Sequence, residues 1–327
     1  YGMSYYLRGA KDYVNNNIIF GGFQWKIVRI NGNGSIRLIY NGTCPNNNCT
    51  INSTGTTTQI GTSAFNTNYN DAKYVGFMYG GADGVASTSR EQATTNETSS
   101  TIKTYLDNWY STNILNTDYE NYISDTLFCN DRQLRSEVGG VTSGTGFGTE
   151  STWYAAFYRL FTNKNPNLKC GLQNDRFTES DTTLGNAALT YPIGLITVDE
   201  ASIAGLLYGT INNSNYLYNN QANLTMSSSR FYSSSAQMWS ISPQGLLSQV
   251  THVETTTSGV RPVINLKPNT KVVGNGSASS PYIVQNEVSL GNKIIAQYGG
   301  KDNITEAPEG TFASINGTTD NLMYKME

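Results

Sequence analysis

The chain has 327 residues, and its 21 lysines and arginines nearly balance 24 aspartates and glutamates, for a net charge of −3. This balance gives no electrostatic basis for binding nucleic acid or an anionic membrane. One histidine and dispersed carboxylates leave little material for acid–base or metal chemistry, so we predict no catalytic residues, no metal and no cofactor. The 22 tyrosines, with many Asn, Ser, Thr and Gly residues, are instead typical of surfaces that recognise partners.

The N-terminal part of the chain predicts β-strands joined by tight turns. Ile18–Phe20 and Trp25–Ile30 are apolar segments separated by a Gly-Gly pair, and a further apolar segment begins at Ile36 after an Asn-Gly turn signal. Arg29 and Arg37 alternate with apolar neighbours, which predicts strands with one face in water.

Two later segments predict helices. Thr197-Val-Asp-Glu200 is a capping box that opens a helix through about Leu207. The segment 98–115 has the clearest helical period, with Thr98 or Ser99 as its N-cap. Its apolar positions fall on one face and predict core contacts rather than a ligand stripe: Ile102, Leu106, Trp109 and Tyr110.

The four cysteines allow three disulfide connectivities. Cys44 and Cys49 lie in one polar loop, so a local bond between them is the simplest pairing. Cys129 and Cys170 would then close a loop of about forty residues and constrain the unfolded chain by about 4 kcal/mol on the loop-entropy model. Four free thiols in a cytosolic protein are the alternative, and zinc is disfavoured because no Cys-x2-Cys pair is present. Disulfides would place the chain outside the reducing cytosol.

A stretch rich in Asn, Tyr and Ser, residues 210–236, predicts a surface loop that cannot bury a core face. Tyrosine and arginine supply much of the binding energy at protein interfaces. We therefore predict a ligand- or partner-binding surface here, and a solvated loop without function is the alternative. The predicted contacts are Tyr216, Tyr218, Arg230 and Tyr232.

The triplet Asn-Asp-Arg occurs twice, at 130–132 and at 174–176, each time just after a distal cysteine. A paired polar site is one interpretation. The other, which we favour, is that these Asp and Arg side chains satisfy turns and each other near the disulfide.

Val260, Val263, Ile264 and Leu266 form a short apolar run that predicts a buried strand. Arg261 and Pro262 interrupt it, although a proline removes a ladder donor and a buried arginine needs oxygen partners. We predict that Arg261 is structural, bonded by carbonyls or an acidic side chain in the core beside Trp239.

The segments Met238–Pro243 and Ser258–Leu266 resemble the closing core of the C-type-lectin-like fold. The form they resemble most is shared by formylglycine-generating-enzyme-like domains, phage and retroelement variable proteins, and repeat domains of surface proteins in gut Firmicutes. The similarity extends upstream to Tyr5–Gly9, Phe20–Ile30 and Gly34–Tyr40, and so covers roughly residues 1–286. It implies an α+β, sulfatase-modifying-factor-like domain with twisted antiparallel sheets, two main helices and long loops.

The chemistry known for that fold is not carried by this sequence. The oxidising cysteines of the formylglycine-generating branch lie close to the arginine-containing strand, whereas the nearest preceding cysteine here is Cys170. The calcium signatures of sugar-binding lectins are missing, since Trp239 is followed by Ser240-Ile241. His252 has no nucleophile signature beside it.

From about residue 287 the composition of the chain changes. Residues 287–327 are predicted to form an extended linker or tail that joins the domain to a next module or subunit. In the family, segments like Asn321–Glu327 lead into segments like Tyr1–Gly9, so the two ends of this chain resemble the two sides of one joint. We predict an inter-module junction between copies, whose residues are Tyr5, Tyr6, Leu322, Met323, Tyr324 and Met326.

These observations predict a non-enzymatic structural or adhesion module on the outside of a bacterial cell, repeated or polymerised head to tail into a surface fibre. Its partners would be neighbouring copies of itself, and a host or cell-surface protein or glycan. No apolar run is long enough for membrane insertion. We interpret the chain as a processed or excised segment of a longer protein. The alternatives are a receptor-binding protein of phage or retroelement type, and an enzyme on the formylglycine-generating-enzyme fold.

Overall fold

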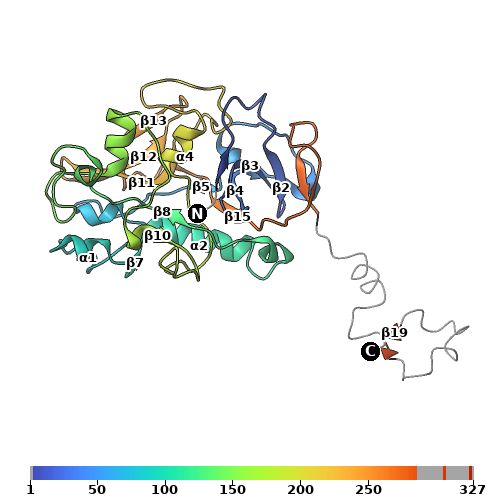
Figure 1. Ribbon diagram of the computed structural model, residues 1–327, viewed down its shortest axis with the longest axis horizontal. Coiled ribbons are helices and arrows are strands. Elements are labelled where there is room, and N and C mark those ends of the chain that lie inside the picture. Colours follow the sequence, from blue (N-terminus) through green and yellow to red (C-terminus); the bar gives the residue numbers. More distant parts are fainter. Residues whose placement is uncertain (1–2, 286–304, 307–323, 326–327) are drawn as a thin grey trace, which may run out of the picture. The chain divides into compact units, whose positions relative to one another are not determined.

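The computed structural model describes residues 3–285, 305–306 and 324–325. The chain divides into two compact units, Tyr1–Val284 and Gln285–Glu327. The larger unit is an α+β domain in which strands predominate and the helices are few and short (Figure 1). None of the helices in the described residues is long and apolar enough to cross a membrane.

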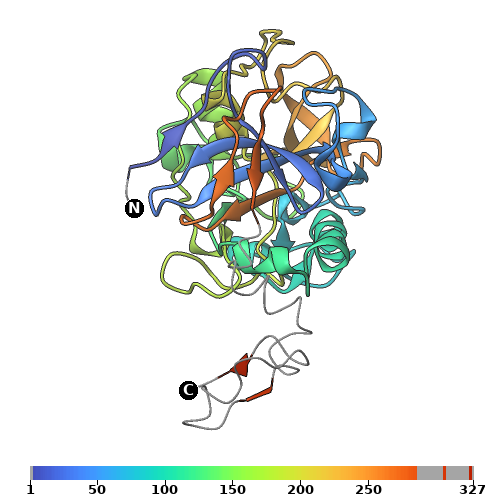
Figure 2. The same cartoon turned by 90° about the vertical axis from the view of Figure 1, so that its right-hand side faces the viewer.

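The first sheet has seven strands in the order β15-β4-β3-β2-β17-β16, and β1 pairs with the far end of β3. Figure 2 looks onto this curled sheet, whose first strands are blue and whose last are orange. The predicted apolar segments at 18–20 and 25–30 lie in β2 and β3, which pair antiparallel through a Gly-Gly turn. The bounds are β1 Tyr5–Tyr6, β2 Asn17–Phe20, β3 Phe23–Ile30, β4 Ile36–Thr43, β15 Val263–Leu266, β16 Val272–Val273 and β17 Tyr282–Val284.

The second sheet has the order β13-β12-β11-β14-β5, with β9 added beside β11. Its labelled strands lie to the left of the first sheet in Figure 1. The bounds are β5 Gly61–Thr62, β9 Thr152–Trp153, β11 Asn223–Tyr232, β12 Ser235–Ile241, β13 Leu247–His252 and β14 Gly259–Val260.

Strand β11 corrects the prediction of a surface loop over 210–236. Its residues up to Ser229 are all buried, even though five of them carry polar side chains in the middle of the sheet. The burial is possible because the hydroxyls have partners: Thr225 donates to the carbonyl of Trp239, and Ser229 to that of Gln249. A small hydroxyl that is hydrogen-bonded inside a sheet loses little by leaving water.

Three short strand pairs complete the sheet structure of the described residues: β6 Met78–Tyr79 with β7 Thr98–Ser99, β8 Phe128–Cys129 with β10 Arg176–Phe177, and, in the smaller unit, β18 Thr305–Glu306 with β19 Tyr324–Lys325. The helices are α1 Arg90–Thr94, α2 Thr101–Asn113, α3 Ala155–Phe157, continued by a π-helical turn at Tyr158–Thr162, and α4 Val198–Ile203. Single 3-10 turns occur at Pro45–Asn47, Thr56–Thr58, Ala72–Val75, Asp118–Tyr122, Arg135–Val138 and Gln173–Asp175.

Both predicted helices are present with shifted ends. Helix α2 is capped by Ser100, because Thr98 and Ser99 pair with β6 as strand β7. The capping box at Thr197 and Glu200 is formed, but α4 ends at Ile203 instead of continuing to Leu207.

Helix α2 packs against the first sheet through aromatic rings. The ring of Trp109 lies 5.2 Å from Phe23, 6.1 Å from Trp25 and 5.9 Å from Tyr40, measured between ring centroids. Edge and tilted contacts of this kind add to the area that the rings bury. The predicted apolar positions Ile102, Leu106 and Tyr110 are all buried in the same core.

Both predicted disulfides are formed, Cys44–Cys49 and Cys129–Cys170, and the described residues contain no free cysteine. The second bond anchors strand β8 to the segment before β10, so that the loops between them are held against the domain.

Candidate functional site

A cleft of about 820 Å³ opens beside the N-terminal strand. Strand β1 and the β3–β4 turn form one wall, and the segments around the Cys129–Cys170 disulfide form the other. Its lining mixes apolar with hydrogen-bonding side chains, as ligand- and peptide-binding clefts do. The lining includes Tyr6, Arg29, Leu127, Lys169, Arg176 and Leu184.

Strand β1 sits at this wall because Tyr5 and Tyr6 pair antiparallel with Ile30 and Arg29. Successive side chains of a strand point to opposite faces. Ser4 and Tyr6 accordingly line the cleft, whereas Tyr5 is 60% exposed. Within the described residues β1 pairs only with β3, so its other edge has no strand partner.

A small inner pocket, which shares Arg29 and Lys169 with the cleft, is lined by a buried cluster of charges around Glu200. The Glu200 carboxylate lies 2.5 Å from Arg37 Nε and 3.2 Å from Arg29 Nη1, and it accepts the Thr197 backbone N–H at 2.8 Å. Burial opposes ionisation of Glu200, but the two arginines and the capping contact outweigh it and lower the pKa of the carboxyl. Arg37 is buried beside this carboxylate. The prediction that its side chain faces water is therefore wrong.

A second buried cluster adjoins the first in the same small inner pocket. Arg159 Nη2 lies 2.6 Å from a carboxylate oxygen of Asp131 and 2.6 Å from one of Asp199. Burial raises the pKa of Asp131 to about 6, and the attraction of Arg159 offsets this only in part. Asp131 Oδ1 has no hydrogen-bond partner among the described residues.

The rim of the cleft favours anionic groups. Asp125 is already satisfied by the backbone N–H groups of Glu179 and Ser180, at 2.8 Å each. Lys169 is exposed, and its ammonium group has no hydrogen bond or ion pair within the part of the chain that the structure describes. Arg176 donates to the Cys170 carbonyl at 2.9 Å and remains half-exposed. The cleft can thus hold an apolar segment flanked by carboxylates.

The predicted recognition residues are not brought together as one surface. Tyr216 is 1% exposed and belongs to the core, which corrects its prediction as a binding contact. Its hydroxyl donates to the Leu7 carbonyl at 3.2 Å, and its backbone N–H donates to the Gly9 carbonyl, so that it anchors the chain after β1. Tyr218 is half-buried beside Gly245.

Arg230 and Tyr232 do lie together, at the end of β11, and they form a ledge with two residues that the sequence did not single out. The Arg230 guanidinium lies 5.1 Å from the Tyr232 ring, which contacts Trp153 at 5.8 Å, and Arg135 lies 4.6 Å from Trp153. Tyr232 is 43% exposed. We call Arg135, Trp153, Arg230 and Tyr232 the aromatic ledge; Trp153 joins it because β9 pairs with β11.

Arg261 is 2% exposed and donates to the carbonyls of Tyr40 and Leu217 and to Asn41 Oδ1, at 2.8, 2.7 and 2.9 Å. These bonds tie the segment between β14 and β15 to β4 and to the segment that precedes β11. Trp239 is fully buried in β12, and its ring meets the edge of Tyr208.

The lone histidine meets a serine and a glutamate, but not in the arrangement of a catalytic triad. Both Ser235 Oγ, at 2.9 Å, and Glu254 Oε1, at 3.6 Å, approach the same nitrogen, Nδ1 of His252. In a triad the acid and the nucleophile contact opposite ring nitrogens. The described residues also contain no group of three or more His, Cys, Asp or Glu side chains that could hold a metal ion.

Of the predicted junction residues, Tyr5 and Tyr6 are placed as described above. Tyr324 lies in β19, whose backbone pairs with β18, and Leu322, Met323 and Met326 lie outside the described residues. No family model, curated protein or solved structure matches this chain. The site is therefore interpreted from its own geometry.

Proposed function

We propose that this chain is a non-enzymatic, extracellular module with a C-type-lectin-like fold that associates head to tail with neighbouring copies in a bacterial surface fibre. The motifs of residues 1–286 support the fold, and two disulfides fit an oxidising location. An enzyme on the same fold would rest on fold analogy alone, which is a weak argument for activity.

Strand β1 carries this proposal. It is two residues long, pairs on one side only among the described residues, and presents Tyr5 to solvent and Tyr6 to the cleft. An exposed strand edge can be extended by a strand of another chain, with main-chain hydrogen bonds for affinity and side-chain pockets for specificity.

The partner segment in this proposal is Leu322–Glu327 of a neighbouring copy. Leu322, Met323, Tyr324 and Met326 form an apolar group that gains by leaving water, and Tyr6, Leu127 and Leu184 offer it apolar contact in the cleft. The acidic residues Asp320 and Glu327 flank the segment and complement Lys169 and Arg176 at the rim. Contacts between unlike surfaces propagate into chains unless the rotation closes a ring.

A complementation experiment tests the proposal with the full chain. A head variant, Tyr5→Asp with Tyr6→Asp, and a tail variant, Leu322→Asp with Met323→Asp, should each lose association by at least about tenfold in Kd, since a buried aromatic contact at an interface commonly contributes more than 1 kcal/mol. Mixed together, the two variants should form dimers only, because one intact head and one intact tail remain. Light scattering after size exclusion measures each size distribution.

Tyr13→Asp is the matched control, because Tyr13 is 87% exposed and does not line the cleft. It should associate as the unaltered chain does. Wild-type protein that stays monomeric at the highest soluble concentration, or a tail variant that still forms chains, would contradict the head-to-tail assignment.

A receptor-binding role is the second candidate, and the aromatic ledge favours it. Stacked aromatic and arginine side chains on a half-exposed surface are frequent anchors for protein and glycan partners. Tyr232→Ser should then abolish binding to a host or cell-surface ligand without changing self-association. Unchanged adhesion of that variant to target cells would contradict a binding role for the aromatic ledge.

A further inference from the structure

Lys26 is a buried lysine whose contacts are carboxamides rather than carboxylates. It lies in β3 with 2% of its surface exposed, and its Nζ contacts Asn17 Oδ1 at 2.5 Å and also Asn52 Oδ1. No salt bridge to Lys26 occurs among the described residues. A buried ammonium without an anion is unfavourable, and such a group tends to become neutral.

The surrounding charges act in the same direction. Burial and the nearby Arg261 guanidinium lower the pKa of Lys26 to about 7, with Lys11 adding a smaller effect and Asp12 opposing it. A large fraction of the side chain is then a free amine at neutral pH. A free lysine amine is a nucleophile, which is how buried lysines with a lowered pKa act in covalent chemistry.

Both carboxamides are held with their oxygens toward this amine. Asn17 is the cross-strand partner of Lys26 in the β2–β3 hairpin, and its Nδ2 donates to the Gly276 carbonyl at 2.8 Å. Asn52 is half-buried in the loop after the Cys44–Cys49 disulfide, and its Nδ2 donates more weakly to the Lys11 carbonyl, at 3.3 Å. The electrophilic Cγ carbon lies one bond beyond each contacted oxygen.

We propose that Lys26 and Asn52 join in an intramolecular isopeptide bond. Lys26 Nζ attacks Asn52 Cγ, the Nζ–Cγ bond forms, the Cγ–Nδ2 bond breaks, and a proton passes from Nζ to the leaving nitrogen, which departs as ammonia. The reaction is a transamidation and needs no oxidant or co-reactant. Asn17 orients the amine by accepting one of its N–H groups.

Asn52 is the acceptor rather than Asn17 for two reasons. The Nδ2 group of Asn17 is enclosed and firmly bonded, so ammonia has no route out, whereas Asn52 is partly open to solvent. The bond would also tie the loop after the first disulfide to β3, over a sequence separation of 26 residues. A cross-link of that span stabilises a fold mainly by restricting the unfolded chain.

Intact mass spectrometry of the reduced, full chain tests the bond. The expected mass is lower than that of the sequence by one molecule of ammonia, and a protease digest should contain a branched peptide joining the segments around Lys26 and Asn52. Lys26→Arg and Asn52→Ala should each restore the full mass expected for the variant. Asn48→Ala, at an exposed position between the two cysteines just before this loop, is the matched control and should keep the deficit.

The design separates the bond from other ways of losing ammonia. A succinimide at one of the Asn-Gly sequences would give the same deficit, but it would persist in Lys26→Arg and yield no branched peptide. Full mass in the folded wild-type protein, a deficit that survives Asn52→Ala, or a branched peptide that contains Asn17 would each overturn the assignment. Because Asn52 is in a half-buried loop, circular dichroism of Asn52→Ala checks that the variant folds.

Discussion

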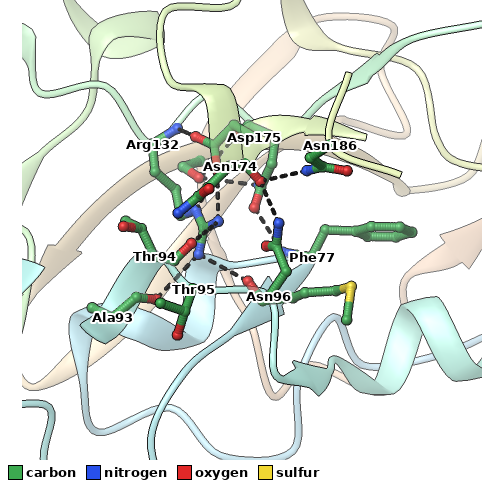
Figure 3. Close-up of polar contacts among 12 residues, drawn as sticks. Phe77, Ala93, Thr94, Thr95, Asn96, Arg132, Asn174, Asp175 and Asn186 are labelled. Carbon is green, nitrogen blue, oxygen red and sulfur yellow. Dashed lines mark hydrogen bonds and ion pairs between the residues drawn. The ribbon is translucent and has the colours of Figure 1, made fainter. Parts of the chain in front are cut away.

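The same three residues, Asn-Asp-Arg, occur at 130–132 and at 174–176, but the two triplets differ in burial and in their contacts. Every residue of the first triplet is buried, whereas Asn174 is exposed and Arg176 is half-buried at the cleft. The arginine of the first triplet is bonded to the aspartate of the second, because Arg132 Nε donates to Asp175 Oδ1 at 2.7 Å (Figure 3). The favoured interpretation, that these side chains satisfy each other near the disulfide, therefore describes Arg132 and Asp175.

The difference lies in what surrounds each arginine. Besides Asp175, Arg132 donates to the carbonyls of Ala93 and Thr94, both at 3.2 Å (Figure 3), and to that of Met78 at 2.8 Å. These bonds hold α1 and β6 against the two segments that contain the triplets. Within the described residues, the Arg176 side chain has only the Cys170 carbonyl and Gln173 Oε1 as partners. A residue type thus acquires a structural or a surface role from its partners, not from its immediate neighbours in sequence.

The largest effect is expected from removing the first arginine. Arg132→Met should lower the free energy of unfolding by about 3–5 kcal/mol, because it leaves the fully buried Asp175 carboxylate without its charge partner. Arg176→Met is the matched variant and should cost about 1 kcal/mol, the value of ordinary hydrogen bonds near the surface. Urea unfolding without reductant measures both. Equal losses would mean that the two arginines are not distinguished by burial.

The first triplet should also impose a pH dependence through Asp131. Its pKa is raised from 3.8 to about 6, so the folded protein binds this proton more readily than the unfolded chain. The contribution of this group to stability therefore falls as pH rises from 3.8 to about 6, at up to about 1.4 kcal/mol per pH unit. Asp131→Asn should remove that component of the slope, and Arg159 would keep its two bonds to Asp199.

Chemical unfolding at a series of pH values between 4 and 7 provides the measurement for the Asp131 prediction. Glu150→Gln, on an exposed loop, is a control for a general loss of negative charge. If both variants keep the wild-type slope over that interval, Asp131 does not contribute to it.

A smaller difference is expected between the two asparagines. The Asn130 side chain accepts the Phe77 N–H at 2.7 Å and donates to the Val75 and Met226 carbonyls at 3.1 and 2.9 Å. Asn130→Ala should cost about 1–3 kcal/mol, because buried backbone groups lose their partners. Asn174→Ala should change stability by less than about 0.5 kcal/mol, as exposed substitutions usually do. Thermal unfolding followed by circular dichroism resolves this contrast, and a costly Asn174→Ala would refute it.

Much of the secondary structure was predictable because its signals are local. Apolar segments with turn residues between them predicted β2, β3 and β4, and the capping box at Thr197 predicted the start of α4. The pairing of Cys44 with Cys49 followed from their nearness in one loop. Strand β11 was missed because its serines and threonine look like loop residues until their hydrogen-bond acceptors are known.

The candidate site was only partly predictable. The sequence suggested Tyr5 and Tyr6 as junction residues, which stays a prediction, but the opposite wall of the cleft comes from segments more than a hundred residues away. Trp153 and Arg135 join the aromatic ledge through the β9–β11 pairing. The sequence around either residue contains no pattern that predicts this pairing. Tyr216 was assigned to the surface because its polar neighbours hid its burial beneath the N-terminal segment.

The amino-acid sequence alone predicted the first strands and their turns, the helix start at Thr197 and the Cys44–Cys49 pair, because each depends on backbone preferences or contacts within a short stretch of chain. Which charged side chains are buried, and which partners they have, depends on the tertiary structure. Arg37 alternates with apolar residues as a surface residue would, yet it is buried because Glu200, 163 residues later, reaches its guanidinium. A buried charge is stable only beside a counter-charge, and the position of that partner is a property of the whole fold.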